Sequence, residues 1–401
     1  MGRKRLNSQN LTRRAFLTRS LLGAAAGIGA IARDARLPAA AEPRQAQGER
    51  GFQPAELAAM EQLAADFMAK YHAPALSIAI AKQGRLVYAH GFGNATEQEA
   101  LTPRHVFRIA SVSKPITSAM IMHLVENGRL KRSDRVFGPK GVLGTEFGRP
   151  PYKPYVEELT IDHLLTHTSG GWQNDGSDPM FRHLQMDHKA LITWAIENAP
   201  LTHAPGAHWA YSNFGYSVLG RVIEKVTGEP YEAAVKKAIL KRCGITGMGI
   251  AGNTLQDRRP DEVTYEGQGQ NPYNMNVTRM DAHGGWLASP TDLVRFAVRM
   301  DGFPTVPDIL SAETLKTLTT PTAAQGGGGY GRGWSVNSQH NYWHNGSLPG
   351  TSTIMVRTSG GFCWAALTNT RVSGIDLALD QLIWNMIGKI TVWPARDLFS
   401  S

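Results

Sequence analysis

The sequence predicts an α+β fold, in which one antiparallel sheet flanked by helices is built from both chain ends around an inserted, mostly helical domain. Two observations lead to this prediction. Short β-branched or aromatic segments lie near residues 75–90 and again after residue 331, whereas residues 130–284 show mainly helical spacing punctuated by Gly and Pro. The chain has 401 residues, of which 42% are hydrophobic and 19% charged, so it can bury the core that such a fold needs. A site is expected in the cleft between sheet and inserted helices, where pockets prefer to form.

The amino-terminal half of the sheet is expected to be a hairpin that follows a helix. Apolar residues at helical spacing predict an amphipathic helix from Pro54 to Tyr71. Residues 75–81 and 86–90 flank a short turn segment that contains Gly84, which predicts two paired strands. Another helix is expected to run to about Asn127, where Gly128 would end it.

The remaining elements follow from the same patterns. Inserted helices are expected over residues 161–165, 189–199, 216–227 and 231–241, with a further helix over 291–300. Strands are expected over residues 331–336, 341–344, 351–357 and 362–367, before a last helix over 375–387. This order predicts a linker at residues 42–53, an α/β domain of residues 54–110 plus 285–401, and a mostly helical domain of residues 111–284.

The first 41 residues have the composition of an export signal. They contain Thr12-Arg13-Arg14-Ala15-Phe16-Leu17, then a mild apolar run over residues 21–32, then Ala39-Ala40-Ala41 before Glu42. This pattern is similar to a twin-arginine signal peptide with an Ala-x-Ala cleavage site. The mature protein is therefore expected to begin near Glu42 and to work in the periplasm or as a secreted bacterial protein. No later segment reaches membrane-spanning length, so no stable membrane span is expected.

Charge, cysteines and histidines exclude several other classes of protein. The leader holds eight basic residues against one acidic residue, so it carries seven of the nine formal positive charges and leaves no basic patch for nucleic acid. Cys243 and Cys363 are too few for a disulfide framework, and we expect them to be unpaired, although one bridge is possible in an oxidising compartment. The histidines lack metal-site spacing, so no metal and no organic cofactor are expected.

A serine and a lysine three residues apart form the first candidate site. A hydroxyl is a poor nucleophile until a base takes its proton. Residues three apart on a helical turn lie on one side, which places the Lys114 amine beside the Ser111 hydroxyl. The amine can be the base only if desolvation or nearby charge lowers its pKa from about 10.4. Because Pro115 keeps the regular helix from beginning far upstream, Ser111 is expected on the entering turn.

Ser-x-x-Lys alone arises about once or twice by chance in a chain of this length, so it needs support from other residues. Two further clusters add the groups that a nucleophilic serine needs. In Tyr211-Ser212-Asn213 a phenol is available to relay a proton, and an amide to contact both substrate and Lys114. In His344-Asn345-Gly346-Ser347 a glycine lets substrate approach the backbone, and the following N–H can face the carbonyl oxygen under attack.

These three motifs in this order, with Leu164-Leu165-Thr166-His167-Thr168-Ser169-Gly170 and Gly284-Gly285-Trp286, resemble the serine β-lactamase and penicillin-binding-protein superfamily. Within it, the chain is most similar to the branch of class C β-lactamases, D-Ala-D-Ala carboxypeptidases and family VIII carboxylesterases. The resemblance extends over roughly residues 56–387.

The resemblance implies a role for each matching residue. Ser111 would be the acylated nucleophile, Lys114 its proton acceptor and Tyr211 the general acid and base. Asn213 would bind the acyl side chain of the substrate. The oxyanion hole would use the backbone N–H groups of Ser111 and Ser347, the residue after Gly346. His344 stands where β-lactamases usually have lysine, and Asn345 replaces the usual hydroxyl that helps to hold a substrate carboxylate. Histidine at this place resembles the peptidase and esterase members.

The sequence thus predicts an exported serine hydrolase that cleaves an ester or amide of a small-molecule or peptide substrate through an acyl-enzyme on Ser111. Its activity would be that of a carboxylesterase or a D-Ala-D-Ala carboxypeptidase. A class C-like β-lactamase is one alternative. A non-catalytic protein that binds wall peptide or another ligand on the same scaffold is the other.

Overall fold

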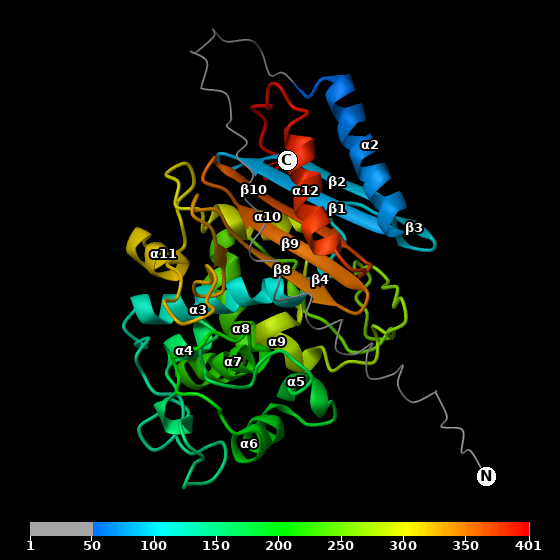
Figure 1. Cartoon of the computed structure of the whole chain (residues 1–401). Coiled ribbons are helices and arrows are strands. Elements are labelled where there is room, and N and C mark those ends of the chain that lie inside the picture. The colour runs from blue at the N-terminus through cyan, green and yellow to red at the C-terminus, as the bar shows by residue number, and fades with distance from the viewer. Residues whose placement is uncertain (1–50, 401) are drawn as a thin grey trace, which may run out of the picture.

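The computed structural model describes residues 51–400 (Figure 1). The predicted signal peptide and most of the predicted linker lie outside the described residues. Phe52, at the end of that linker, packs edge-on against Tyr88 and Trp393 and so belongs to the folded domain. None of the helices within residues 51–400 combines the length and the apolar character needed to cross a membrane.

The main sheet has seven strands, all paired antiparallel, in the order β3-β2-β1-β10-β9-β8-β7. Its amino-terminal strands are β1 (Ala75–Lys82), β2 (Arg85–Thr96) and β3 (Glu99–Ala100). Its carboxy-terminal strands are β7 (Ser335–Val336), β8 (Tyr342–Leu348), β9 (Thr351–Arg357) and β10 (Phe362–Thr368). Pairing of β1 with β10, with Ile80 opposite Trp364, joins the two chain ends in one sheet. The predicted α+β fold is therefore confirmed.

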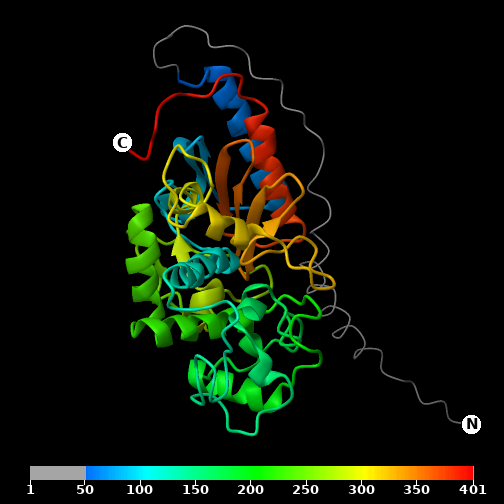
Figure 2. The same ribbon diagram turned by 90° about the vertical axis from the view of Figure 1, so that its left-hand side faces the viewer.

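Both faces of this sheet are covered by helices, which explains why its central strands are almost wholly buried. On one face, helices α2 (Pro54–Tyr71) and α12 (Ile375–Ile387) lie side by side (Figures 1 and 2). They pack on alternate large residues of the strands, such as Ile78 and Trp364. The opposite face carries small residues, such as Ala79 and Ala365, against which α10 (Pro290–Val298) packs.

The other helices belong mainly to the inserted part of the chain, which lies below the sheet in Figure 1. They are α3 (Ser113–Glu126), α4 (Ile161–Leu165), α5 (Pro179–Arg182), α6 (His188–Asn198), α7 (Asn213–Thr227), α8 (Tyr231–Val235) and α9 (Asp281–Gly284), with α11 (Ala312–Thr319) beyond α10. Helix α3 packs against α7 and α9 and begins directly after the turn that carries Ser111. The nucleophile therefore lies where the sheet meets the inserted helices.

Several elements differ from the sequence prediction for local physical reasons. A second sheet of β4 (Phe107–Arg108), β6 (Trp286–Ala288) and β5 (Gly249–Ile250) was not predicted, because strands of two or three residues show no periodicity. Strand β5 comes from the inserted part and pairs with β6, which lies beyond it, so this small sheet crosses the predicted boundary at residue 284. The domain division at residues 111 and 284 stays a prediction. The strand predicted over residues 331–336 is reduced to β7, because Gly333 has φ +82° and breaks the extended backbone.

Two helices also depart from the prediction. The helix predicted over residues 231–241 is α8 followed by a π-helical turn over 236–240 and a 3₁₀ turn over 241–243, ended by Gly244 at φ 71°. Helix α11 was missed, although Ser311 caps its first turn by accepting a hydrogen bond from the Thr314 N–H. Cys243 and Cys363 are both free and buried, as expected.

Candidate active site

The turn that carries Ser111 is held in a conformation that the chain would not adopt alone. Ala110 has φ +49°, a left-handed conformation that costs a non-glycine residue about 1–3 kcal/mol. Its neighbour Ile109 is fixed on both sides, because its N–H donates to the Trp286 carbonyl at 2.9 Å and its carbonyl accepts from Thr353 Oγ1 at 2.8 Å. A 3₁₀ turn over Ala110–Val112 then leads into α3. Ser111 is thus placed on the entering turn, as predicted, with partial exposure.

Lys114 converges on Ser111 with a set of partners that suits a neutral amine. Its Nζ lies 3.0 Å from Ser111 Oγ, 2.8 Å from Asn213 Oδ1 and 2.9 Å from the His283 carbonyl oxygen. The amide and backbone carbonyls can only accept, so they take the two N–H groups of a neutral amine. The lone pair is then left for the Ser111 hydroxyl. Burial lowers the pKa of Lys114 well below its usual value, and the charge of Asp178 opposes this only in part.

Tyr211 completes the group as a proton donor. Its ring centroid lies 4.7 Å from Lys114 Nζ, and its hydroxyl is hydrogen-bonded to Ser111. Burial raises the pKa of Tyr211 well above its usual value of 10, so the phenol stays protonated at neutral pH. This state suits the proton relay that the sequence predicts for Tyr211. Since the lysine is held neutral and the tyrosine is held protonated, Lys114 is the group that can accept the serine proton.

Asn213 lies beside Lys114, and its predicted role in binding the acyl side chain stays a prediction. Its Nδ2 donates to Asn174 Oδ1 at 2.9 Å and to Asp178 Oδ2 at 3.1 Å, while its Oδ1 accepts from Lys114. Both N–H groups are therefore engaged inside the protein. The amide orients the lysine and has no free donor left for a substrate.

Both ring nitrogens of His344 are also held by hydrogen bonds. Nδ1 lies 2.7 Å from the Asn345 carbonyl oxygen, which can only accept, so Nδ1 carries the proton. Nε2 is then the acceptor for the Tyr330 hydroxyl at 3.1 Å. Burial, reinforced by the nearby Lys114, lowers the pKa of His344 to about 3. The imidazole is thus neutral and has no free nitrogen, unlike the lysine usual at this place.

Gly346 allows β8 to lie directly on the serine turn. A Cβ at this position would be 2.1 Å from the Ile109 carbonyl oxygen, so only glycine fits. The role predicted for the Ser347 N–H in the oxyanion hole stays a prediction. Asn345 is opposite Ile354, whose side chain packs under α2 and α12, so strand alternation directs Asn345 to that face rather than to the Ser111 side. A role for Asn345 in binding the substrate therefore stays a prediction.

Sequence reasoning missed the polar residues that support this group. Asp178 is fully buried behind Asn213, and the His283 carbonyl is a partner of Lys114. Asp178-Pro179 is a typical helix start, and Asp178 does cap α5. That signal predicts the cap but not the second contact of Asp178, which is with Asn213, 35 positions away in the sequence.

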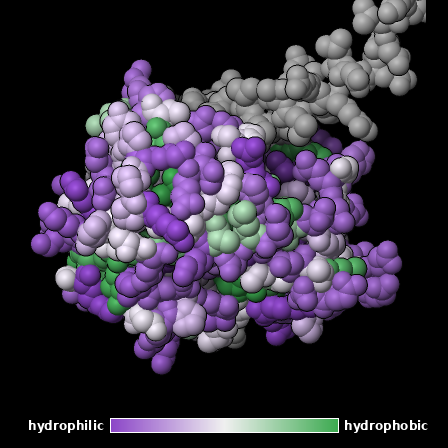
Figure 3. Space-filling model, turned by 90° about the horizontal axis from the view of Figure 1, so that it is seen from below, coloured by the Kyte–Doolittle hydropathy of each residue, from purple (hydrophilic) through white to green (hydrophobic). Residues whose placement is uncertain are grey.

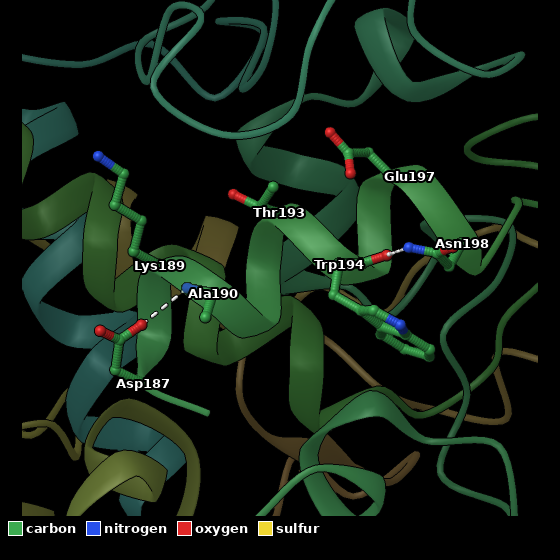
Figure 4. Close-up of a pocket in the computed structure, with 7 residues that line it drawn as sticks. All are labelled: Asp187, Lys189, Ala190, Thr193, Trp194, Glu197 and Asn198. Carbon is green, nitrogen blue, oxygen red and sulfur yellow. Dashed lines mark hydrogen bonds between the residues drawn. The ribbon is translucent and has the colours of Figure 1, made fainter. Parts of the chain in front are cut away.

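A separate hollow lies on the inserted helices, away from Ser111. The hollow has a volume of about 390 Å³ and runs along α6; the residues that line it are Asp187, Lys189, Ala190, Thr193, Trp194, Glu197 and Asn198 (Figure 4). None of these residues belongs to the group around Ser111. The face seen from below is largely hydrophilic, with small, separate hydrophobic patches (Figure 3).

An activated serine beside a neutral lysine and a protonated tyrosine, set between an antiparallel sheet and inserted helices, defines the class: a serine hydrolase of the β-lactamase and penicillin-binding-protein superfamily. The chain belongs to the Beta-lactamase family, whose family model matches residues 60–385. The resemblance inferred from the motifs is therefore confirmed.

Individual proteins agree with this assignment. The chain is 27% identical over 295 residues to Protein flp of Staphylococcus aureus, covering 72% of this chain and 57% of flp. It is 27% identical over 316 residues to Penicillin-binding protein 4* of Bacillus subtilis, covering 70% of this chain and 64% of that protein. The chain thus spans less than two thirds of the length of these relatives. The octameric penicillin-binding protein homologue of Pyrococcus abyssi superposes with a TM-score of 0.65 and 25% identity, covering 83% of this chain and 77% of that one.

Proposed function

We propose that the protein is an exported hydrolase that cleaves an ester or amide through an acyl-enzyme on Ser111, with the specificity of a carboxylesterase or a D-Ala-D-Ala carboxypeptidase. The observation that carries the proposal is the position of Lys114 Nζ, 3.0 Å from Ser111 Oγ, with its two other close partners being carbonyl oxygens. This arrangement supports proton transfer from the serine to the lysine at neutral pH.

The proposed reaction follows from these contacts. Ser111 Oγ attacks the substrate carbonyl carbon while Lys114 accepts the hydroxyl proton, and the carbonyl oxygen becomes an oxyanion facing the N–H groups of Ser111 and Ser347. As the bond to the leaving group breaks, Tyr211 gives that group its proton and regains one from Lys114. A water molecule then loses a proton to the same pair and attacks the ester carbonyl. The acid leaves, and Ser111 regains its hydrogen.

Two contacts favour simple esters over substrates that carry an acylamino group and a carboxylate, whether penicillins or D-Ala-D-Ala peptides, and so favour the carboxylesterase of the two proposed specificities. Recognition of an acylamino side chain needs a free amide donor, and both N–H groups of Asn213 are already donated to Asn174 and Asp178. A substrate carboxylate needs a nearby cation, and His344 is neutral with both ring nitrogens engaged. Short-chain esters require neither group, so we expect them to be the better substrates.

The first experiment compares Ser111→Ala with Ser338→Ala, an exposed serine on a loop, using p-nitrophenyl acetate and butyrate. We expect Ser111→Ala to lose about 10⁴-fold or more in kcat while both variants keep the wild-type melting temperature. Mass spectrometry should detect an acyl adduct on Ser111 alone. Wild-type turnover by Ser111→Ala would refute the proposal.

The same preparation separates the alternatives. Fast nitrocefin hydrolysis with inert esters would identify a class C-like β-lactamase, and release of D-alanine from a model wall peptide would identify the carboxypeptidase. Failure of a fluorophosphonate probe to label Ser111 would favour the non-catalytic ligand-binding protein. Export is tested by replacing Arg13 and Arg14 together by lysine, which should keep the full-length chain in the cytoplasm, whereas the wild type should begin near Glu42 outside it.

A further inference from the structure

The residue behind Asn213 has the contacts of a group that controls the catalytic lysine. Asp178 is fully buried at the start of α5. Its Oδ1 accepts from the Met180 N–H at 3.0 Å, and its Oδ2 accepts from Asn213 Nδ2 at 3.1 Å. Each oxygen therefore faces a donor, and both of these hydrogen bonds favour the ionised carboxylate.

The segment that carries Asp178 is fixed by a single buried cation. The Arg279 guanidinium donates to the carbonyl oxygens of Met180, His183 and Met186, with the Met180 contact at 2.7 Å. These contacts hold the short helix α5 and the residues after it against the inserted helices. The carboxylate therefore has a fixed position rather than the freedom of a surface loop.

Three contacts in series, through two residues, thus connect this carboxylate with the nucleophile. Asp178 accepts from the amide of Asn213, the amide carbonyl accepts from Lys114, and Lys114 lies next to Ser111. Because an amide has one donating and one accepting end, a carboxylate at Nδ2 forces Oδ1 towards the lysine. A reversed amide would place N–H groups against the lysine N–H groups and remove the partner that keeps the lone pair aimed at Ser111.

We propose that Asp178 is a positioning residue of the hydrolase, which acts through the Asn213 amide to orient Lys114 and whose negative charge tunes the proton affinity of that lysine. This inference rests on the proposed function, because it assigns Asp178 to the same acylation step. Asp178 does not touch the substrate in this scheme. Its effect should therefore appear in the acylation rate and in its pH dependence, and not in substrate binding.

The charges around the pair give the sign of the pH effect. The charge of Asp178 raises the pKa of Lys114 and that of Tyr211, in both cases as a smaller effect than burial. Burial in turn raises the pKa of Asp178 to about 7, against the opposing effect of its Met180 and Asn213 hydrogen bonds. The other titratable groups near Lys114 are neutral at pH 7 because burial shifts their pKa values away from it; they are His167, His283, His344 and Tyr216. Removing the carboxylate charge should therefore make Lys114 lose its proton at lower pH.

The test uses the full chain and the rate at which an alkyl fluorophosphonate labels Ser111 between pH 5 and 10. This readout needs the nucleophile and its base but no particular ester. If every ester substrate failed, the proposed function would be refuted, and the labelling rate of Ser111 could still be measured and compared between variants. In Asp178→Asn we expect a labelling rate about 10- to 100-fold lower at pH 8, because one new N–H faces a donor and the amide is misoriented. We also expect the rising limb of the profile to move down by about one pH unit.

The control and the double variant distinguish positioning from general damage. Asp175→Asn, in the same segment but with a side chain that bonds Gln173 and Ser177 rather than Asn213, should label within about twofold of the wild type. Because Asp178 acts through Asn213, adding Asp178→Asn to Asn213→Ala should cost little beyond Asn213→Ala alone. Independent losses that multiply, or a profile whose rising limb does not move, would overturn the proposal.

A folding defect in Asp178→Asn would not leave the question undecided. Asn213→Leu removes the link and keeps Asp178 in place, so it should also slow labelling about 10- to 100-fold. Wild-type labelling by a folded Asn213→Leu protein would refute the role of Asp178, because the chain of contacts would then be dispensable.

Discussion

Replacing Gly346 by alanine tests the contact between the sheet and the serine turn. The new Cβ would lie 2.1 Å from the Ile109 carbonyl oxygen, 2.4 Å from Thr353 Oγ1 and 3.1 Å from the Ala110 Cβ. Ordinary contact begins at 3.4 Å, so β8 and the turn must separate by more than 1 Å. The nearest atom is backbone, and it cannot rotate away as a flexible side chain would.

The expected loss follows from what this movement displaces. Ser347 directly follows Gly346, so separation of the strand from the turn pulls apart the two N–H groups proposed to bind the oxyanion. Loss of one such donor costs about 100- to 1,000-fold in kcat, or about 2.7–4 kcal/mol of transition-state stabilisation. A displacement of about 1 Å alone costs about 100-fold. We therefore expect kcat/KM for p-nitrophenyl butyrate to fall by two to three orders of magnitude, with kcat carrying most of the loss.

Suitable controls separate geometry from stability. Gly51→Ala adds a Cβ that meets nothing within 4 Å and should leave both kcat/KM and the melting temperature unchanged. Circular dichroism and thermal melts of Gly346→Ala should show a folded protein, because only β8, next to the short edge strand β7, is displaced. A folded Gly346→Ala enzyme with activity within threefold of the wild type would contradict the reasoning that β8 sets the oxyanion site.

Two other predictions concern proton transfer. Activity should rise with pH through the lowered pKa of Lys114, because only the neutral amine accepts the Ser111 proton, and the midpoint measured from kcat/KM should lie well below 10.5. A midpoint near the ordinary lysine value would exclude Lys114 as the buried base. Replacing Tyr211 by phenylalanine should lower kcat about 100- to 10,000-fold, since the phenol is the proton donor hydrogen-bonded to Ser111. Esters with very acidic leaving groups need less protonation and should lose less, so an equal loss for all leaving groups would argue against that role.

The sequence predicted those features that depend on local pattern or on a fixed spacing. The strand over residues 351–357 and the helices over 161–165 and 375–387 were predicted with the bounds that the structure shows. Ser111 and Lys114 were paired correctly because three residues on a turn fix their separation. The contact of Lys114 with Asn213 was also expected, since an amide offers the lysine an acceptor.

Features that depend on tertiary contacts were not accessible from the sequence. Asp178 lies 64 residues from Lys114 along the chain, and only the fold brings its carboxylate behind the Asn213 amide. The positive φ of Ala110 carries no residue signal, because alanine rarely adopts it unless the surrounding structure imposes it. Asn345 was assigned to the site by its place in a motif, whereas the register of β8 and β9 directs its side chain to the other face.

The polar groups of the site explain what remains for a substrate to bind. Lys114, Asn213 and His344 are each fully hydrogen-bonded inside the protein, and burial favours the neutral form of the lysine and of the histidine. Burying such groups costs stability unless their partners satisfy them, so the network is needed to keep the amine uncharged and aimed. The groups left to meet a substrate are the Ser111 hydroxyl, the Tyr211 hydroxyl and backbone N–H groups. These groups recognise a carbonyl and its leaving atom rather than a charged side group, which supports the proposal that neutral esters are the better substrates.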